Sequence, residues 1–231
     1  MAAKQTAKAV IAKKKIWVPI LAPKLFNEQL IGESFVEEPA QLMGRVATVS
    51  LMTLLGDPQK QTTSVSFKVT SVDKDAVRTE MIGYKLLPSA AKKMMRRRRE
   101  KIDDSFIVET KDKKIIRIKP LIITRGRTTG SVLALMRKLE KAYIAKTISN
   151  SDFDMLVQDV VQKKLQHGLS QLLRHIYPLG ACEIRQFELI APEKIKELGL
   201  KITLPPEKIP EFKTEKKAEQ ESPPAEASTQ A

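Results

Sequence analysis

The sequence predicts an α+β fold, in which an antiparallel, barrel-like β-sheet carries flanking α-helices between disordered termini. Alternation of apolar and polar residues dominates residues 16–124, and apolar residues then recur at helical spacing over residues 128–177. Alternation returns over residues 181–191, which predicts a last strand. At 231 residues the chain can bury a proper core, so we expect a single globular domain over residues 16–204.

Both ends of the chain differ in composition from the middle. Residues 1–15 carry five lysines and no acid, which is typical of a flexible basic arm. Residues 205–231 are rich in Pro, Glu and Lys and poor in apolar side chains, which predicts a disordered tail. A short exposed helix is expected before that tail, over residues 193–198.

Order is expected to begin at residues 16–18, a short extended segment that Pro19 and Pro23 end. Trp17 and Phe26 are the large apolar side chains of this entry, and we expect both to be buried. We therefore assign them to the core rather than to a base-stacking surface.

The first strands follow from alternation. Residues 47–51 alternate apolar and hydroxyl side chains, and Gly-Asp-Pro at residues 56–58 ends that segment with a loop. Residues 64–70 and 77–81 alternate in the same way on either side of a tight turn at residues 73–75. We expect these last two segments to pair as an antiparallel hairpin.

A second hairpin is expected over residues 105–119, with its turn at residues 112–114. Pro120 argues that its strand lies at an edge of the sheet or ends there, because proline cannot donate to a strand ladder. Together these segments predict five or six antiparallel strands, curled or closed into a barrel.

A basic run lies between the two hairpins, at residues 92–101. Pro88 suits a first helical turn, and Lys, Met and Arg propagate helix well, so we expect the run to be helical. The four arginines at 96–99 would then sweep roughly 300° of the helix circumference, because successive residues are rotated by about 100°. Such a girdle repels itself unless anions surround it. We expect Asp103 and Asp104 to steady its end electrostatically.

The helical region opens with apolar residues spaced three or four apart between Val132 and Tyr143. A loop with good N-cap candidates follows at residues 149–152. A second amphipathic helix is expected from Phe153, and Gly168 should break or bend it before the apolar stripe continues.

The chain is strongly basic. Lys and Arg number 41 against 27 Asp and Glu, giving a formal net charge of +14. Residues 207–231 hold four lysines and six glutamates, so they carry −2 and residues 1–206 carry +16. This excess favours nucleic acid as the partner, before an anionic membrane surface.

The single cysteine, Cys182, excludes an intrachain disulfide, and no apolar run approaches the roughly 18 residues of a membrane span, so we expect a cytoplasmic protein.

Catalytic and metal-binding constellations find little support. His167 and His175 lie eight residues apart without carboxylates at ligand spacing, so we interpret them as surface or packing residues. Asp103 and Asp104 are adjacent and would point to opposite faces of an extended segment, so they cannot act as a carboxylate pair. No glycine-rich phosphate loop is present in the sequence. We therefore expect no enzyme activity, no metal and no cofactor.

Two alternatives to a structural nucleic-acid binder remain open. One is a metal-dependent RNA-processing enzyme, although its acidic residues have no partners at useful spacing. The residues available to it are Glu80, Asp103, Asp104 and Glu109. The other is peripheral membrane attachment through the basic arm and helix, which lack the broad apolar face that interfacial insertion uses.

Nucleic-acid binding is better supported. Aromatic residues are 5% of the chain, and the basic stretches contain no aromatic platform for single-stranded bases. No helix carries polar base-reading residues along one face. We therefore expect recognition of backbone and shape, as in structured RNA. The residues predicted to bind RNA are Lys13, Lys14, Lys15, Lys92, Lys93, Arg96, Arg97, Arg98, Arg99, Lys101, Arg125, Arg127, Arg137, Lys138 and Lys141.

Four stretches, in order along the chain, carry a family resemblance. They are Trp17 with residues 22–27 and 31–32, residues 44–46 with 49–51, residues 96–99 with 101–104, and residues 176–179 with 184–185. Together they resemble the archaeal and eukaryotic small-subunit ribosomal protein family called S-three-a-e or S-one-e, over about residues 15–190. The compact N-terminus and the intact arginine run look more like archaeal members.

The resemblance implies a structural protein of the small-subunit platform with a barrel-like sheet, and neither catalysis nor a cofactor. It implies binding to small-subunit ribosomal RNA near its 3′ end and near the messenger exit, where messenger RNA is a further contact. Neighbouring platform proteins are the other partners implied, and we expect no homo-oligomer. Two features depart from the family pattern: lysines follow Asp112 where many members place glycine, and the tail matches no family motif.

Overall fold

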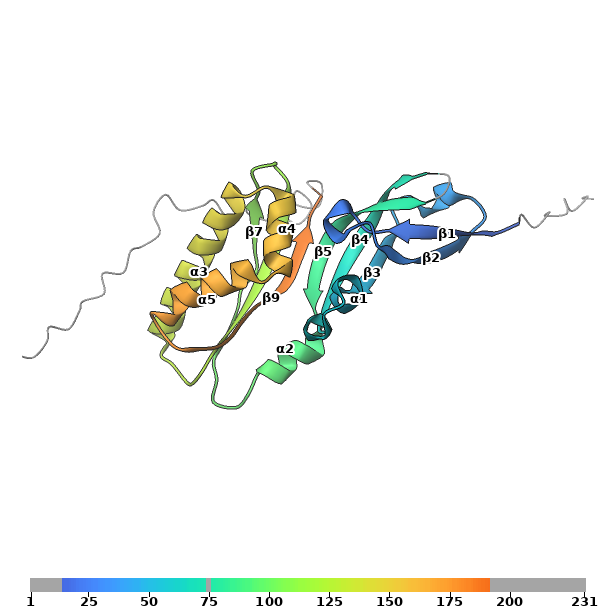
Figure 1. Ribbon diagram of the computed structural model, residues 1–231. Helices are drawn as coiled ribbons and strands as arrows, with labels where there is room; N and C mark the ends of the chain where they lie inside the picture. Colours follow the sequence, from blue (N-terminus) through green and yellow to red (C-terminus); the bar gives the residue numbers. More distant parts are fainter. Residues whose placement is uncertain (1–13, 74–75, 192–231) are drawn as a thin grey trace, which may run out of the picture.

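The computed structural model describes residues 14–73 and 76–191 (Figure 1). Most of the predicted basic arm, the predicted helix at 193–198 and the predicted tail at 205–231 lie outside these residues. The strands are β1 (Ile16–Leu21), β2 (Leu30–Val36), β3 (Val46–Ser50), β4 (Thr63–Val72), β5 (Val77–Leu86), β6 (Lys101–Asp103), β7 (Phe106–Glu109), β8 (Ile115–Thr124) and β9 (Leu179–Leu189). The α-helices are α1 (Leu51–Leu55), α2 (Pro88–Met94), α3 (Gly130–Asn150), α4 (Phe153–Val161) and α5 (Lys164–Arg174), and short 3-10 turns cover Lys24–Phe26, Pro39–Leu42 and Pro58–Lys60.

Within the described residues the nine strands form one sheet, in the order β2-β1-β5-β9-β8-β6. β4 pairs along the other edge of β5 and carries β3, while β7 pairs with β8. Neighbouring strands are antiparallel except β1 and β5, which run parallel over two residue pairs. The α+β prediction is therefore confirmed, but the sheet is not closed into a barrel: no pairing among the described residues joins the end strands β2 and β6.

The first strand departs from its prediction. β1 continues through Pro19 to Leu21, because β5 begins to pair with it only at Ile20 and the missing N–H of Pro19 meets no strand on that side. Trp17 is not buried but 65% exposed, since Val18 takes the inward position and adjacent residues of a strand face opposite ways. Phe26 is buried as predicted.

Both predicted hairpins are confirmed. β4 and β5 pair antiparallel from Val72–Val77 outward, although residues 74–75 of the turn lie outside the described part. β7 and β8 pair in the same way. Their turn places Lys113 at a left-handed φ of 58°, and the buried Thr110 closes it, because its hydroxyl donates to Lys114 O at 3.0 Å and accepts from Lys114 N at 3.2 Å. A lysine is thus held where glycine would be favoured.

β3 is one residue shorter than the alternation suggested. It ends at Ser50, whose hydroxyl accepts from Met52 N at 3.3 Å and so caps α1. Leu51 is buried as the first residue of that helix rather than as a strand residue. Gly56, in a left-handed conformation, ends α1 at the predicted loop.

Pro120 lies inside β8 rather than at an edge or an end, so that prediction is wrong. On one side β6 pairs up to Leu121 and β7 begins at Ile118, which leaves Pro120 in the gap between them. On the other side Lys119 is opposite Gln186 while Pro120 is opposite Ile184, so Arg185 is an extra residue in β9. Pro120 is therefore accommodated at a β-bulge, where a strand can do without one ladder hydrogen bond.

The long helices cover one face of the sheet, where Figure 1 shows α3, α4 and α5 grouped around β7 and β9. Their apolar stripes pack with β8 and β9 side chains such as Ile118 and Phe187, both fully buried. α3 extends to Asn150, two residues into the loop predicted at residues 149–152. The break between α4 and α5 falls at Lys163, with φ 62°, and not at Gly168. Gly168 instead lies inside α5, where any Cβ would collide with the hydroxyl of Tyr143 on α3.

α2 is shorter than predicted, and the four arginines do not form a helical girdle. The helix ends at Met94, because Met95 is extended with ψ 119° and Arg98 takes a left-handed φ of 66°. Guanidiniums on consecutive residues repel one another, and a loop lets them move further apart than a helix with a rise of about 1.5 Å per residue would allow. Among the described residues no helix is long and apolar enough to cross a bilayer.

Candidate nucleic-acid interface

The arginine loop, residues 95–100, joins α2 to β6. Arg96, Arg97 and Arg98 are exposed, and Arg99 is half-buried. Within the part of the chain that the structure describes, none of these arginines forms an ion pair. An exposed cationic loop without carboxylate partners keeps its full attraction for an external anion.

The far end of the loop is fixed to the sheet. Glu100 N donates to the Thr124 hydroxyl at 2.9 Å, and Thr124 N donates to Glu100 O at 3.0 Å. Arg99 lies over the start of β9, because a Cβ on Gly180 would be 3.2 Å from Arg99 Nη1. The loop therefore has a defined base, while its three outer arginines are exposed.

A second group of cations lies on the outer face of the sheet, which we define as the face of β6, β8 and β9 opposite α3–α5. Ile116 and Ile118 of β8 point into the core, so Arg117 and Lys119 between and after them point outward. Lys101 of β6 lies on this face as well. Arg185 joins them because of the bulge opposite Pro120, which places it and Gln186 on the same side.

The charge on this face perturbs its own members. Burial lowers the pKa of the Lys119 ammonium, and the positive charges of Arg117 and Arg185 lower it further, against smaller effects of Glu188 and Asp103. Lys119 Nζ donates to Gln186 Oε1 at 2.9 Å. A cation whose pKa is lowered by neighbouring cations indicates a positive potential that would favour a bound anion.

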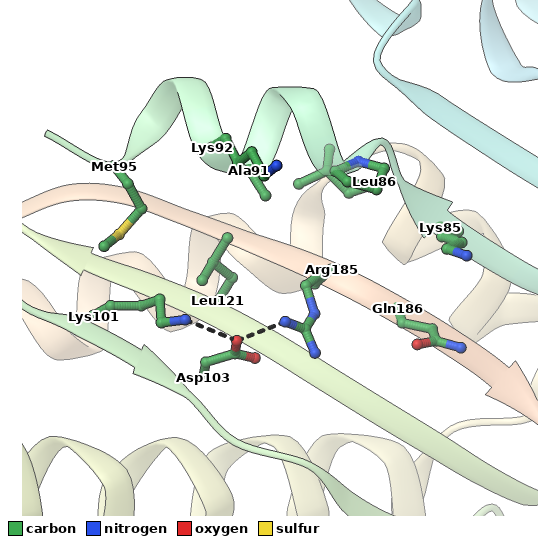
Figure 2. A pocket seen from close by; sticks show the side chains of 11 residues that line it. Lys85, Leu86, Ala91, Lys92, Met95, Lys101, Asp103, Leu121, Arg185 and Gln186 are labelled. Atoms are coloured by element: carbon green, nitrogen blue, oxygen red, sulfur yellow. Dashed lines mark hydrogen bonds and ion pairs between the residues drawn. The ribbon is translucent and has the colours of Figure 1, made fainter.

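Between α2 and the outer face lies a cleft of about 390 Å³, which we call the α2 cleft (Figure 2). Its floor is polar: Asp103 Oδ2 accepts from Arg185 Nη1 at 2.6 Å and from Lys101 Nζ at 3.3 Å. Figure 2 shows Ala91 and Met95 on the α2 side above this floor. The residues that line the cleft are Lys85, Leu86, Pro88, Ala91, Lys92, Met95, Lys101, Asp103, Leu121, Arg185 and Gln186.

The structure does not bring the predicted N-terminal lysines to the arginine loop. Lys14 and Lys15 are exposed before β1, and Lys13 lies outside the described residues. β1 pairs with the first residues of β5, whereas α2 and the loop follow its last residue. The two groups are therefore separated by the length of a ten-residue strand.

Arg125 and Arg127 do share an end of the sheet with the loop. Both are exposed in the segment after β8, whose last residue is Thr124, the anchor of Glu100. The segment is held by Arg125 N, which donates to Pro178 O at 3.0 Å, and by the Tyr177 hydroxyl, which donates to Arg127 O at 3.0 Å.

The predicted cations of α3 have a carboxylate nearby. Arg137 Nε lies 3.7 Å from Asp104 Oδ1, and Lys141 Nζ lies 3.2 Å from Asp104 Oδ2. Lys138 is exposed, as are Lys92 and Lys93 on α2. Asp103 and Asp104 point to opposite sides of the sheet as expected, but the prediction that they steady the arginine run is wrong, because their cationic partners lie on β6, β9 and α3.

The sequence prediction missed four cations that the structure places on the outer face or in the cleft. They are Lys85, Arg117, Lys119 and Arg185. The alternation that identified Ile116 and Ile118 as core residues also placed Arg117 and Lys119 on the other side, so that signal was available. Arg185 had no such signal, since its direction depends on a bulge in β9 opposite Pro120.

The acids of the sequence alternative are not gathered into one site. Asp103 faces the cleft and Asp104 faces α3, while Glu80 lies opposite Lys68 in the first hairpin and Glu109 opposite Ile115 in the second. The described residues contain no group of three or more His, Cys, Asp or Glu that could hold a metal ion. Burial raises the pKa of the Cys182 thiol to about 12, as expected for a packing residue rather than a nucleophile.

One buried acid stands apart from these groups. Glu140 of α3 is fully buried, and neither carboxyl oxygen has a hydrogen-bond partner among the described residues. Its pKa is raised to about 8, chiefly by burial and secondly by the charge of Asp104, while Lys141 and Arg137 oppose the shift. Glu140 is therefore largely protonated at neutral pH.

Comparison with known proteins finds one family. The family model described as the ribosomal S3Ae family matches residues 3–192. A small ribosomal subunit protein eS1 of Methanothrix thermoacetophila is 32% identical over 191 residues, which cover 83% of this chain and 90% of that protein. The protein of the same name from Nanoarchaeum equitans is 32% identical, over 79% of this chain and 92% of its own length. That from Halorubrum lacusprofundi is 31% identical, over 78% and 83%.

Proposed function

Because the chain belongs to the ribosomal S3Ae family, we propose that it is a structural constituent of the small ribosomal subunit that binds ribosomal RNA, chiefly through the phosphate backbone. The archaeal relatives are named as small-subunit proteins, and none of these names describes an enzyme. The protein would act in the cytoplasm as part of the assembled subunit.

The arginine loop carries this proposal. Three consecutive exposed arginines, without carboxylate partners in the described part of the chain, lie in the loop between α2 and β6. Arginine offers a planar fork of donors that suits bidentate contact with phosphate. Its base on Thr124 limits how far the loop can move, so part of the ordering needed for binding is already present.

The family resemblance supports a more detailed placement. It favours the platform of the subunit, near the 3′ end of the ribosomal RNA and the messenger exit. Neighbouring platform proteins are then further partners, with messenger RNA as a contact at the exit. A single copy per subunit is expected, rather than a homo-oligomer.

Salt dependence of RNA binding tests the loop. We expect R96A/R97A/R98A to flatten the slope of log affinity against log salt by about 2–3, since each neutralised phosphate contributes about 0.7–0.9. The measurement is a filter-binding or fluorescence titration of the full chain with small-subunit ribosomal RNA at several salt concentrations. Arg99 is left in place because it packs against Gly180.

A matched control removes three exposed lysines away from the loop. K24A/K68A/K146A loses the same charge from the 3-10 turn after β1, from β4 and from an exposed position of α3. Its slope should change by less than about 1. Equal changes in the two triple variants would mean that net charge, and not the loop, sets the affinity.

Assembly into the subunit is a separate check. An epitope-tagged chain expressed in archaeal cells should sediment with small subunits and remain there after a wash at moderate salt. Recovery only in the free protein pool would contradict the proposed function, whatever the purified chain does with RNA.

A further inference from the structure

We propose that the α2 cleft is a binding site for a single unpaired nucleotide of RNA, with the base between α2 and the sheet and a phosphate on Arg185 and Lys101. This inference rests on the proposed function, since it names one structural element of the RNA that the protein would bind. It concerns a site other than the arginine loop, built from different elements.

The dimensions and walls of the cleft suit a flat ligand. Its volume of about 390 Å³ lies within the range of roughly 300–1,000 Å³ found for small-molecule sites. The α2 side and part of the floor are apolar, with Ala91, Met95 and Leu121 facing the space (Figure 2). Met95 is 39% exposed, so its polarisable thioether is available to lie against a base.

The cations of the floor are positioned rather than flexible. The bulge at Arg185 turns its side chain toward the cleft, and Asp103 holds the guanidinium at 2.6 Å. The same carboxylate oxygen holds Lys101 at 3.3 Å. The two side chains remain 40% and 43% exposed, and arginine has further N–H donors and a planar face that can lie against a base.

The net positive charge of the residues that line the cleft favours a ligand that carries a phosphate group. The lining carries four cations, Lys85, Lys92, Lys101 and Arg185, against the single acid Asp103, which gives +3. The Gln186 amide is not available to recognise a base, because its oxygen accepts from Lys119 Nζ at 2.9 Å and its nitrogen donates to Glu188 Oε2 at 2.8 Å. Recognition would therefore depend on shape and charge and tolerate different bases.

The cleft is continuous with the arginine loop. Met95 lines the cleft and Arg96 is the next residue, so a backbone that follows the loop passes the mouth of the cleft. A duplex cannot enter a cleft of this volume, because its bases are stacked and paired. A nucleotide turned out of a ribosomal RNA helix or loop could enter the cleft while the RNA backbone contacts the arginine loop.

The test fills the cleft without changing its charge. A91F places a ring in the cleft from α2, and S89F places the same ring on an exposed position of α2 that does not line it. Small-subunit ribosomal RNA is chemically probed with and without the full chain. We expect the wild type and S89F to protect one unpaired nucleotide that A91F leaves reactive, while backbone protection elsewhere is retained.

Removing the base then identifies the contact. An abasic substitution at the protected nucleotide should weaken wild-type binding about tenfold, near the lower part of the range for base stacking, and should not weaken A91F further. R185M, which keeps a long apolar side chain, is a second variant if A91F does not fold by circular dichroism. It should lose protection of the same nucleotide and flatten the salt slope by about 0.7–0.9.

The outcomes separate this inference from the proposed function. If R96A/R97A/R98A flattens the salt slope while A91F and S89F give the same footprint and affinity, the loop binds RNA but the cleft does not hold a nucleotide. If neither the loop nor the cleft variants affect RNA binding, the proposed function fails as well. Calorimetry with adenosine monophosphate and inorganic phosphate adds a third arm: equal binding of phosphate alone by wild type and A91F, with no gain from the nucleoside, would overturn the inference.

Discussion

The arginine loop and the floor of the α2 cleft are neighbouring cationic regions with opposite constructions. Arg96–Arg98 are exposed on a loop and, within the described residues, have no acidic partner. Arg185 and Lys101 lie on paired strands and share the carboxylate of Asp103. The arginine loop offers exposed cations without acidic partners. The floor of the cleft offers cations that Asp103 holds in place and partly neutralises.

Because of this difference, we expect the two regions to contribute differently to RNA binding: one to its affinity and the other to the position of the RNA. Unpaired arginines gain the most from phosphate but must be ordered when they bind, at a cost of about 0.5–1.5 kcal/mol for each flexible side chain. The floor cations are ordered before any ligand arrives, so they lose less entropy, but Asp103 competes with the ligand for them. We therefore expect the loop to dominate the salt dependence of RNA binding and the floor to decide the register of the RNA.

The largest effect should come from a third kind of charge, the buried Glu140. Its pKa is raised from 4.5 to about 8, so protonation favours the folded state, and stability present below pH 4.5 is lost as the pH rises toward 8. At about 1.4 kcal/mol per pKa unit, the difference between 4.5 and about 8 corresponds to a full effect of about 5 kcal/mol. E140Q cannot ionise, so its free energy of unfolding should exceed that of the wild type by about 4 kcal/mol more at pH 9 than at pH 5.

Urea unfolding of both proteins between pH 5 and pH 9 measures this effect. The free energies of unfolding should lie close together near pH 5 and diverge above pH 6. R96A/R97A/R98A serves as the control, because its exposed residues should leave the wild-type pH profile unchanged. Parallel profiles for the wild type and E140Q would show that Glu140 finds partners or solvent in solution.

Regular patterns in the sequence were sufficient for the frame of the fold. The two hairpins, the apolar stripe of the helices and the last strand were predictable because periods of two and about 3.6 residues report which side faces the core. The side of the strand on which Trp17 lies could not be predicted, since either Trp17 or its neighbour Val18 could have faced the core. Barrel closure was not predictable either, because it depends on pairing between strands distant in sequence.

The candidate site was only partly predictable for a similar reason. The arginine loop is visible in the sequence as composition, but helix propensity alone extended α2 past Met94. The floor of the cleft depends on Asp103 meeting Arg185, 82 residues further along the chain, and on the bulge opposite Pro120. Local propensity carries no information about either contact.

The next effect tests whether the floor is held together by Asp103. D103A removes the acceptor of Arg185 Nη1 and Lys101 Nζ and leaves cations facing one another. Hydrogen bonds to charged groups contribute about 1.5–3 kcal/mol, and the partial exposure of Arg185 reduces this, so we expect a loss of about 1 kcal/mol in the free energy of unfolding. The loop triple variant should lose less than about 0.5 kcal/mol.

A double-mutant cycle sharpens that result. If Asp103 acts through Arg185, the loss caused by D103A should shrink in an R185M background, because the partner is already absent. Chemical denaturation of the four proteins gives the coupling energy. Additive losses would mean that Asp103 stabilises the strand in another way and that the floor is not a positioned pair.

The smallest effect is expected from the cations of α3. Asp104 lies within 3.7 Å of Arg137 and 3.2 Å of Lys141, so these two residues share one compensating charge and gain less from phosphate than the loop arginines do. R137A/K141A should therefore change the salt slope of RNA binding by less than about 1, although it removes two charges. R97A/R98A, which removes two exposed and unpaired charges, is the matched comparison and should change it by about 1.4–1.8. Equal changes in slope for the two double variants would place α3 in the RNA interface beside the loop. Arg137 and Lys141 could contribute as much to the salt slope as Arg97 and Arg98 only if phosphates came close enough to displace Asp104.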